Sequence, residues 1–94
     1  MTLVDKYLEY VETVRRYSPR TVGIYSEVLS SYLSYSVGED VQWTDQDIIR
    51  VMTVPMIRNY EVHVLGDESL SPRTVNLHLS VLSGFSKYLV RQRL

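Results

Sequence analysis

The chain has 94 residues, no cysteine and a formal net charge of −1, a size that fits one domain able to bury roughly two thirds of its unfolded surface. The composition excludes a disulfide framework and a thiolate metal site, two histidines are too few for a zinc site, and no apolar run is long enough for a signal peptide or a membrane span. We therefore expect a single cytoplasmic domain over residues 1–94 that has no cofactor and no membrane partner.

Apolar residues recur at helical spacing through the first half of the chain. Residues 3–16 predict a first helix, and Thr2 with Asp5 resembles a capping box with the shorter acid. Residues 19–36 predict a second helix, which begins after a capping serine and ends before Gly38.

The second half of the chain continues this helical pattern. Thr44 with Asp47 caps a third helix, which Pro55 should interrupt or restart. Residues 56–65 alternate in part like a strand, but we expect a helix because no second strand candidate could pair with them. After a turn, residues 72–91 predict the last helix. The predicted fold class is all-α, a four-helix bundle of two helical hairpins.

The pentapeptide Ser-Pro-Arg-Thr-Val occurs twice, at residues 18–22 and 71–75, and opens a predicted helix each time. Serine can cap the free N–H groups of a helix start, and proline fits the first turn. When residues 18–36 are aligned with residues 71–89, nine positions are identical. Five belong to the pentapeptide, and the other four are Val28/Val81, Leu29/Leu82, Ser30/Ser83 and Tyr35/Tyr88. The repeat indicates that these two helices have equivalent roles.

One face of the last helix is basic and polar, although the whole chain is nearly neutral. Residues 1–47 carry four basic and eight acidic side chains, whereas residues 69–94 carry four basic side chains and no acid. Such a face suits phosphate contacts, with an asparagine able to reach a base edge; an ordinary solvated face is the alternative. At 100° per residue the face contains Arg73, Asn76, Ser80, Ser83, Lys87 and Arg91.

A second apolar stripe flanks the core stripe of each repeated helix. In an isolated bundle such a stripe indicates wide burial, and in a larger assembly it could be a docking surface. The stripes contain Ile24, Val28 and Tyr35 in one helix and Leu77, Val81 and Tyr88 in the other.

No arrangement of side chains in this sequence predicts catalysis. Most of the eight tyrosines lie at helical spacing among aliphatic residues, which indicates packing. Neither His63 nor His78 has a serine or acid spaced to form a catalytic constellation with it. We assign no catalytic residue and no cofactor.

The repeated segments, together with residues 79–85 and the aromatic residues Tyr25 and Tyr88, resemble the amino-terminal core-binding domain of tyrosine recombinases, the phage and mobile-element integrase family. The resemblance covers nearly the whole chain. It implies a SAM-like four-helix domain that forms one half of a clamp around the double-stranded DNA of a recombination core site. The other half would be a catalytic domain of the same polypeptide, which we expect to be absent from residues 1–94.

The resemblance also implies where this domain would meet its partners. The starts and exposed faces of the two repeated helices would approach DNA, and neighbouring recombinase protomers would touch through the domain. Combined with the basic face described above, this predicts the DNA-binding residues Arg20, Thr21, Arg73, Thr74, Asn76, Ser80, Ser83, Lys87 and Arg91.

The alternative is a helical protein-interaction module that uses the second apolar stripes to dock another helix or a second copy. The near-neutral charge favours this alternative over DNA binding.

Overall fold

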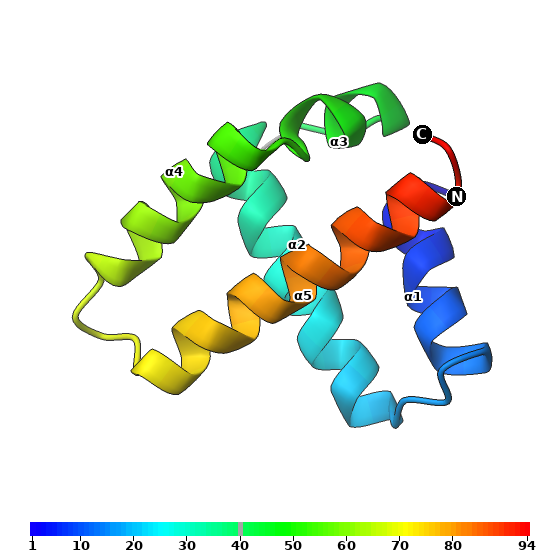
Figure 1. Ribbon diagram of the computed structural model, residues 1–94, viewed down its shortest axis with the longest axis horizontal. Helices are drawn as coiled ribbons and strands as arrows, with labels where there is room; N and C mark the ends of the chain where they lie inside the picture. The colour runs from blue at the N-terminus through cyan, green and yellow to red at the C-terminus, as the bar shows by residue number, and fades with distance from the viewer. Residues whose placement is uncertain (40) are drawn as a thin grey trace.

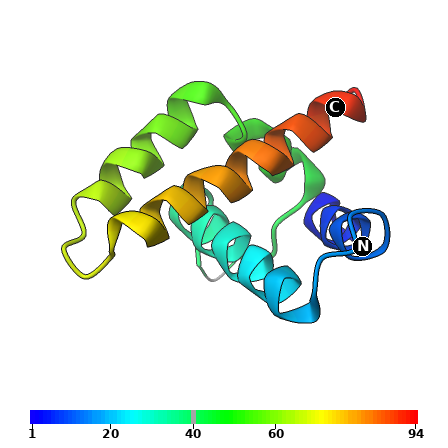
Figure 2. The ribbon, with the colours of Figure 1, turned by 60° about the horizontal axis from the view of Figure 1, so that its bottom comes forward.

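The computed structural model describes residues 1–39 and 41–94, and these residues form five helices and no strand (Figure 1). The all-α class predicted from the sequence is confirmed. Helix α1 packs against α2, α4 packs against α5, and α5 crosses α2, so two helical hairpins face each other (Figures 1 and 2). The helices are α1 (Leu3–Thr13), α2 (Pro19–Ser36), α3 (Asp45–Val51), α4 (Val54–Leu65) and α5 (Pro72–Arg91).

The two copies of the pentapeptide form the same helix start. In each copy the serine is the N-cap of its helix. The Oγ of Ser18 accepts a hydrogen bond of 3.2 Å from the Thr21 N–H, and that of Ser71 accepts one of 3.2 Å from the Thr74 N–H. The same serine Oγ lies 3.0 Å from the threonine Oγ1 in both copies. The capping boxes predicted at Thr2 and Thr44 are also present.

The interruption predicted near Pro55 separates α3 from α4. Helix α3 ends at Val51, and Thr53 has an extended backbone with φ −115° and ψ 157°. Pro55 lies in the first turn of α4, where its missing N–H costs no hydrogen bond. The described residues therefore contain five helices where we predicted four, and the strand alternative for residues 56–65 is wrong.

Helix α1 is shorter than the predicted range of 3–16. It ends at Thr13, and Arg16 adopts the left-handed conformation with φ 56°. This reversal lets the Tyr17 N–H donate to the Val11 carbonyl at 3.0 Å, which turns the chain toward the start of α2.

The core lies where α2 and α5 cross, and its largest fully buried side chains include Tyr32, Phe85 and Leu29. The Tyr32 hydroxyl donates to the Val51 carbonyl, which joins α2 to the end of α3. Val22, Tyr25 and Leu79 lie at helical spacing with these core residues but are only half buried. Of the second apolar stripes, Val28, Val81 and Tyr88 are buried, Ile24 is half buried, and Tyr35 and Leu77 remain 45% and 37% exposed.

Candidate nucleic-acid interface

The predicted polar face of α5 exists in the structure as a row of exposed side chains. The opposite side of this helix, with Val75, Leu82 and Phe85, is buried against the rest of the domain. Among the described residues, the one ion pair is between Arg50 and Asp47, so no carboxylate forms an ion pair with the row, although Glu61 of α4 lines a second hollow beside Lys87. The row consists of Arg73, Asn76, Ser80, Ser83, Lys87 and Arg91, all exposed.

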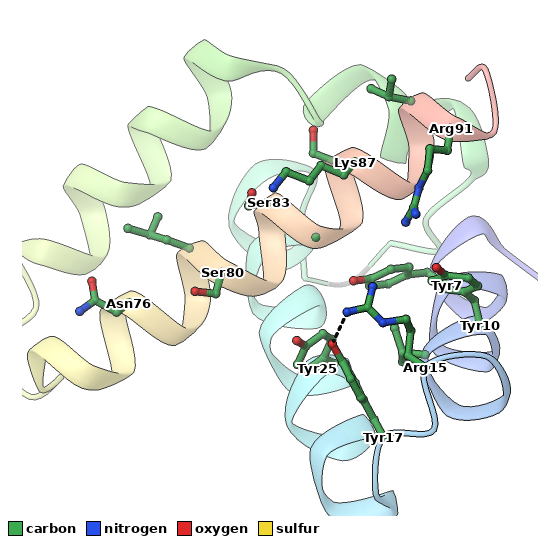
Figure 3. Close-up of a pocket in the computed structure, with 15 residues that line it drawn as sticks. Tyr7, Tyr10, Arg15, Tyr17, Tyr25, Asn76, Ser80, Ser83, Lys87 and Arg91 are labelled. Atoms are coloured by element: carbon green, nitrogen blue, oxygen red, sulfur yellow. Dashed lines mark hydrogen bonds between the residues drawn. The ribbon is translucent and has the colours of Figure 1, made fainter.

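A groove of about 1010 Å³ separates this row from α1 and the first turns of α2 (Figure 3). Basic, hydroxyl and aromatic side chains line it, and none of its described lining residues is acidic. The groove brings together five of the predicted residues, Asn76, Ser80, Ser83, Lys87 and Arg91.

The other four predicted residues lie outside the groove, at the starts of α2 and α5. Arg20 and Arg73 are exposed there, at equivalent places on the first turn. Thr21 and Thr74 are half buried, and each hydroxyl is engaged by the capping serine of its own helix. The threonines therefore stabilise the helix starts, whereas the two arginines are exposed on the surface outside the groove.

Sequence reasoning missed Arg15, which lines the groove from the loop between α1 and α2. Its Nη2 donates a hydrogen bond of 3.4 Å to the Tyr17 hydroxyl, and its guanidinium carbon lies 5.7 Å from the centre of the same ring. The pKa of Arg15 is raised, mainly by hydrogen bonding with Tyr10 and to a lesser extent by the electrostatic effect of Tyr17. The adjacent Arg16 does not line the groove, and no local pattern distinguishes the two arginines before the chain folds.

Arg91 enters the groove from the end of α5, opposite Arg15 (Figure 3). Its guanidinium carbon lies 5.7 Å from the centre of the Tyr10 ring. Each wall of this part of the groove thus has a guanidinium supported by an aromatic ring, an arrangement that holds the charge in place without a carboxylate partner.

Tyrosine hydroxyls line the part of the groove between these two arginines. The pKa of Tyr7 is raised to about 12, chiefly by burial. The pKa of Tyr25 is also raised, mainly by burial and to a lesser extent by hydrogen bonding with Tyr17. Both phenols are therefore neutral hydrogen-bond donors at physiological pH. We expected these tyrosines to pack in the core; Tyr7 does so and also lines the groove.

The two histidines lie away from this groove and pack on tyrosine rings. Tyr60 Oη and His78 Nδ1 are 2.9 Å apart, and the His63 ring stacks on Tyr35 at 4.5 Å. Within the described part of the chain, no cluster of histidine, aspartate or glutamate side chains could hold a metal ion. None of the described helices has the length and apolarity needed to cross a bilayer.

Comparison with known families identifies the class of protein that this fold and groove define. Residues 4–93 match the phage integrase, N-terminal SAM-like domain. The chain therefore belongs to this family of SAM-like domains, which bind DNA in tyrosine recombinases and are their non-catalytic part. No curated protein and no solved structure matches the chain.

Proposed function

We propose that this domain binds the core site of a site-specific tyrosine recombinase as one half of a clamp, without itself catalysing strand exchange. Its partners are double-stranded DNA, a catalytic domain of the same polypeptide, and neighbouring protomers on the DNA. The parent enzyme would exchange DNA strands through that catalytic domain.

The acid-free groove beside α5 is the observation that carries this proposal. Five predicted contact residues and the additional Arg15 meet there, with three cationic side chains and no carboxylate among the described lining residues. Phosphate groups are the anions that such a mixture of guanidinium, ammonium and hydroxyl groups binds. Asn76 lines the same groove and has an amide that matches an adenine edge.

The expected affinity of the isolated domain is low. With about four or five phosphates neutralised, the slope of log K against log salt is about −4, and non-specific Kd values of about 10⁻⁴ to 10⁻⁵ M follow at physiological salt. Tethering to a catalytic domain would make the second contact intramolecular, so that a weak domain contributes strongly to the whole enzyme.

Titration of a fluorescent duplex with this domain, at low and at physiological salt, tests the proposal. We expect salt-sensitive binding that weakens in Arg73→Ala and in Lys87→Ala, with the far-ultraviolet circular dichroism of both variants unchanged because both side chains are exposed. Binding that is unchanged in both variants would exclude the polar face of α5 as the DNA-contact surface. Absence of duplex binding at low salt would remove the proposed function of this domain.

The second candidate function, a protein-interaction module, is favoured by the apolar side chains that remain exposed on the outer surface. Tyr35 and Leu77 keep 45% and 37% exposure, and Val62 and Leu65 on α4 keep 71% and 62%. Sedimentation over a range of concentrations tests self-association: a dimer that Leu77→Glu dissociates supports this function, and a concentration-independent monomer excludes self-association.

A further inference from the structure

The Tyr7 ring is buried, and its hydroxyl forms no hydrogen bond with a described residue. The Tyr7 side chain is 4% exposed, and its Oη lies against the Cα of Gly84, so that a Cβ at Gly84 would approach it to 2.8 Å. Tyr32 and Tyr60, also buried, have partners for their hydroxyls in Val51 and His78. Tyr7 Oη has none among the described residues and stays accessible in the groove, so the fold leaves this hydroxyl free to donate to a ligand.

Tyr7 lines the groove between the wall that carries Arg15 and the wall that carries Arg91. Arg15 is close enough to lower the pKa of both Tyr7 and Tyr25, against the larger effect of burial. Figure 3 shows Arg15 and Arg91 directed into the groove beside Tyr7 and Tyr10. The guanidinium groups of Arg15 and Arg91 and the free hydroxyl of Tyr7 therefore meet in the same part of the groove.

This place matches the chemistry of a phosphodiester. A phosphodiester oxygen accepts hydrogen bonds from several donors at once, and guanidinium forks fit a phosphate in a bidentate manner. A neutral phenol adds a donor without adding charge. The absence of carboxylates among the described lining residues leaves nothing there to repel an anion.

The length of the groove favours a polynucleotide backbone over a free phosphate ion. Its lining on α5 runs from Asn76 to Arg91, and this separation corresponds to about 22 Å of helix axis. A single small anion would occupy one end, whereas a nucleic-acid strand would continue along the hydroxyl groups of Ser83 and Ser80.

We propose that Tyr7, Arg15 and Arg91 form a binding site for one phosphodiester of the DNA backbone. The site rests on the proposed function and extends the DNA contact from α5 to α1 and the loop that follows it. Arg15 and Arg91 bind the charge from the two walls, and Tyr7 Oη donates a hydrogen bond to a phosphate oxygen. Lys87 and the serines of α5 then follow the strand away from this point.

Duplex titrations at several salt concentrations test the site with two variants and a matched control. Arg15→Gln removes one phosphate contact, so the magnitude of the salt slope should fall by about 1. Arg16→Gln makes the same charge change at the next residue, outside the groove, and should leave the slope unchanged. Tyr7→Phe should weaken binding about tenfold with the slope unchanged, because a neutral donor displaces no counterion.

The outcomes separate this inference from the proposed function. If Arg15→Gln and Tyr7→Phe bind like the wild type while Arg73→Ala and Lys87→Ala bind weakly, the site is wrong and DNA binding by α5 stands. If Arg16→Gln lowers the slope as much as Arg15→Gln, the effect is one of overall charge and the site is also wrong. If the wild type fails to bind duplex at low salt, both proposals fail.

A parallel titration with inorganic phosphate, followed by the amide chemical shifts of Arg15 and Gly84, distinguishes the two sources of the anion. For a backbone site we expect weak binding, with the duplex far stronger per phosphate. Tight binding of inorganic phosphate that Tyr7→Phe abolishes, without any effect of Tyr7→Phe on duplex affinity, would overturn the backbone assignment in favour of a free anion.

Discussion

Replacing Gly84 by alanine tests the close packing between α5 and the Tyr7 ring. At an unhindered position inside a helix, glycine to alanine stabilises by about 0.5–1 kcal/mol, because alanine loses less backbone entropy. Gly23, inside α2, is such a position, since nothing lies within 4 Å of its added Cβ. Gly84, inside α5, is different because its Cβ would lie 2.8 Å from Tyr7 Oη.

The Tyr7 ring has little room to move away from that contact. Its centre lies 5.0 Å from the centre of the Phe85 ring and 5.1 Å from that of Tyr88, both of which are buried. Overpacking of this kind costs about 1–3 kcal/mol. Set against the helix gain, Gly84→Ala should destabilise the domain by about 1 kcal/mol, which makes it about 2 kcal/mol less stable than Gly23→Ala.

Urea unfolding at 25 °C, followed by circular dichroism, measures both free energies of unfolding. Combining Gly84→Ala with Tyr7→Phe closes a double-mutant cycle. Without the hydroxyl, the nearest Tyr7 atom to the new Cβ is the ring carbon at 4.0 Å, so alanine should become stabilising and the coupling should be about 2 kcal/mol. Equal stabilisation by Gly23→Ala and Gly84→Ala would show that Tyr7 moves away freely and that its contact with Gly84 imposes no strain.

Two further predictions concern the helix starts and the half-buried histidine. Ser18→Ala and Ser71→Ala should each lower the free energy of unfolding by about 1 kcal/mol, because the two serine caps have the same geometry. Urea unfolding measures both losses, with Ser30→Ala as an exposed helical control. Very unequal losses would contradict the equivalence of the two caps. Burial lowers the pKa of His78 below 6.5, so the unfolded chain binds a proton on His78 more tightly than the folded chain does. Neutral His78 therefore contributes its full stability above the unfolded pKa, and the free energy of unfolding decreases as the pH falls below about 6.5. The urea midpoint should therefore fall more between pH 7.5 and pH 5.5 in the wild type than in His78→Gln, and equal decreases would exclude His78 as the cause.

Most helix positions could be predicted from the sequence, because helix starts and apolar spacing depend on residues within one or two turns of each other. Ser18 and Ser71 cap their own helices, and Pro55 acts on the turn in which it lies. The polar row on α5 is also local, since residues three and four apart share a helical face. The end of α1 was predicted less well because Arg16 takes a left-handed conformation that its residue type does not favour.

The residues that form the groove could not be predicted in the same way, because they come together through contacts between distant helices. Tyr7 and Arg15 reach α5 because α1 packs on α2 and α5 crosses α2, and these contacts join segments from opposite ends of the chain. The same packing buries the Tyr7 ring and leaves its hydroxyl facing the groove without a partner, so one residue serves the core and the site together. Periodicity assigns a side chain to one face of its own helix, but the neighbours that it meets there depend on how the helices cross.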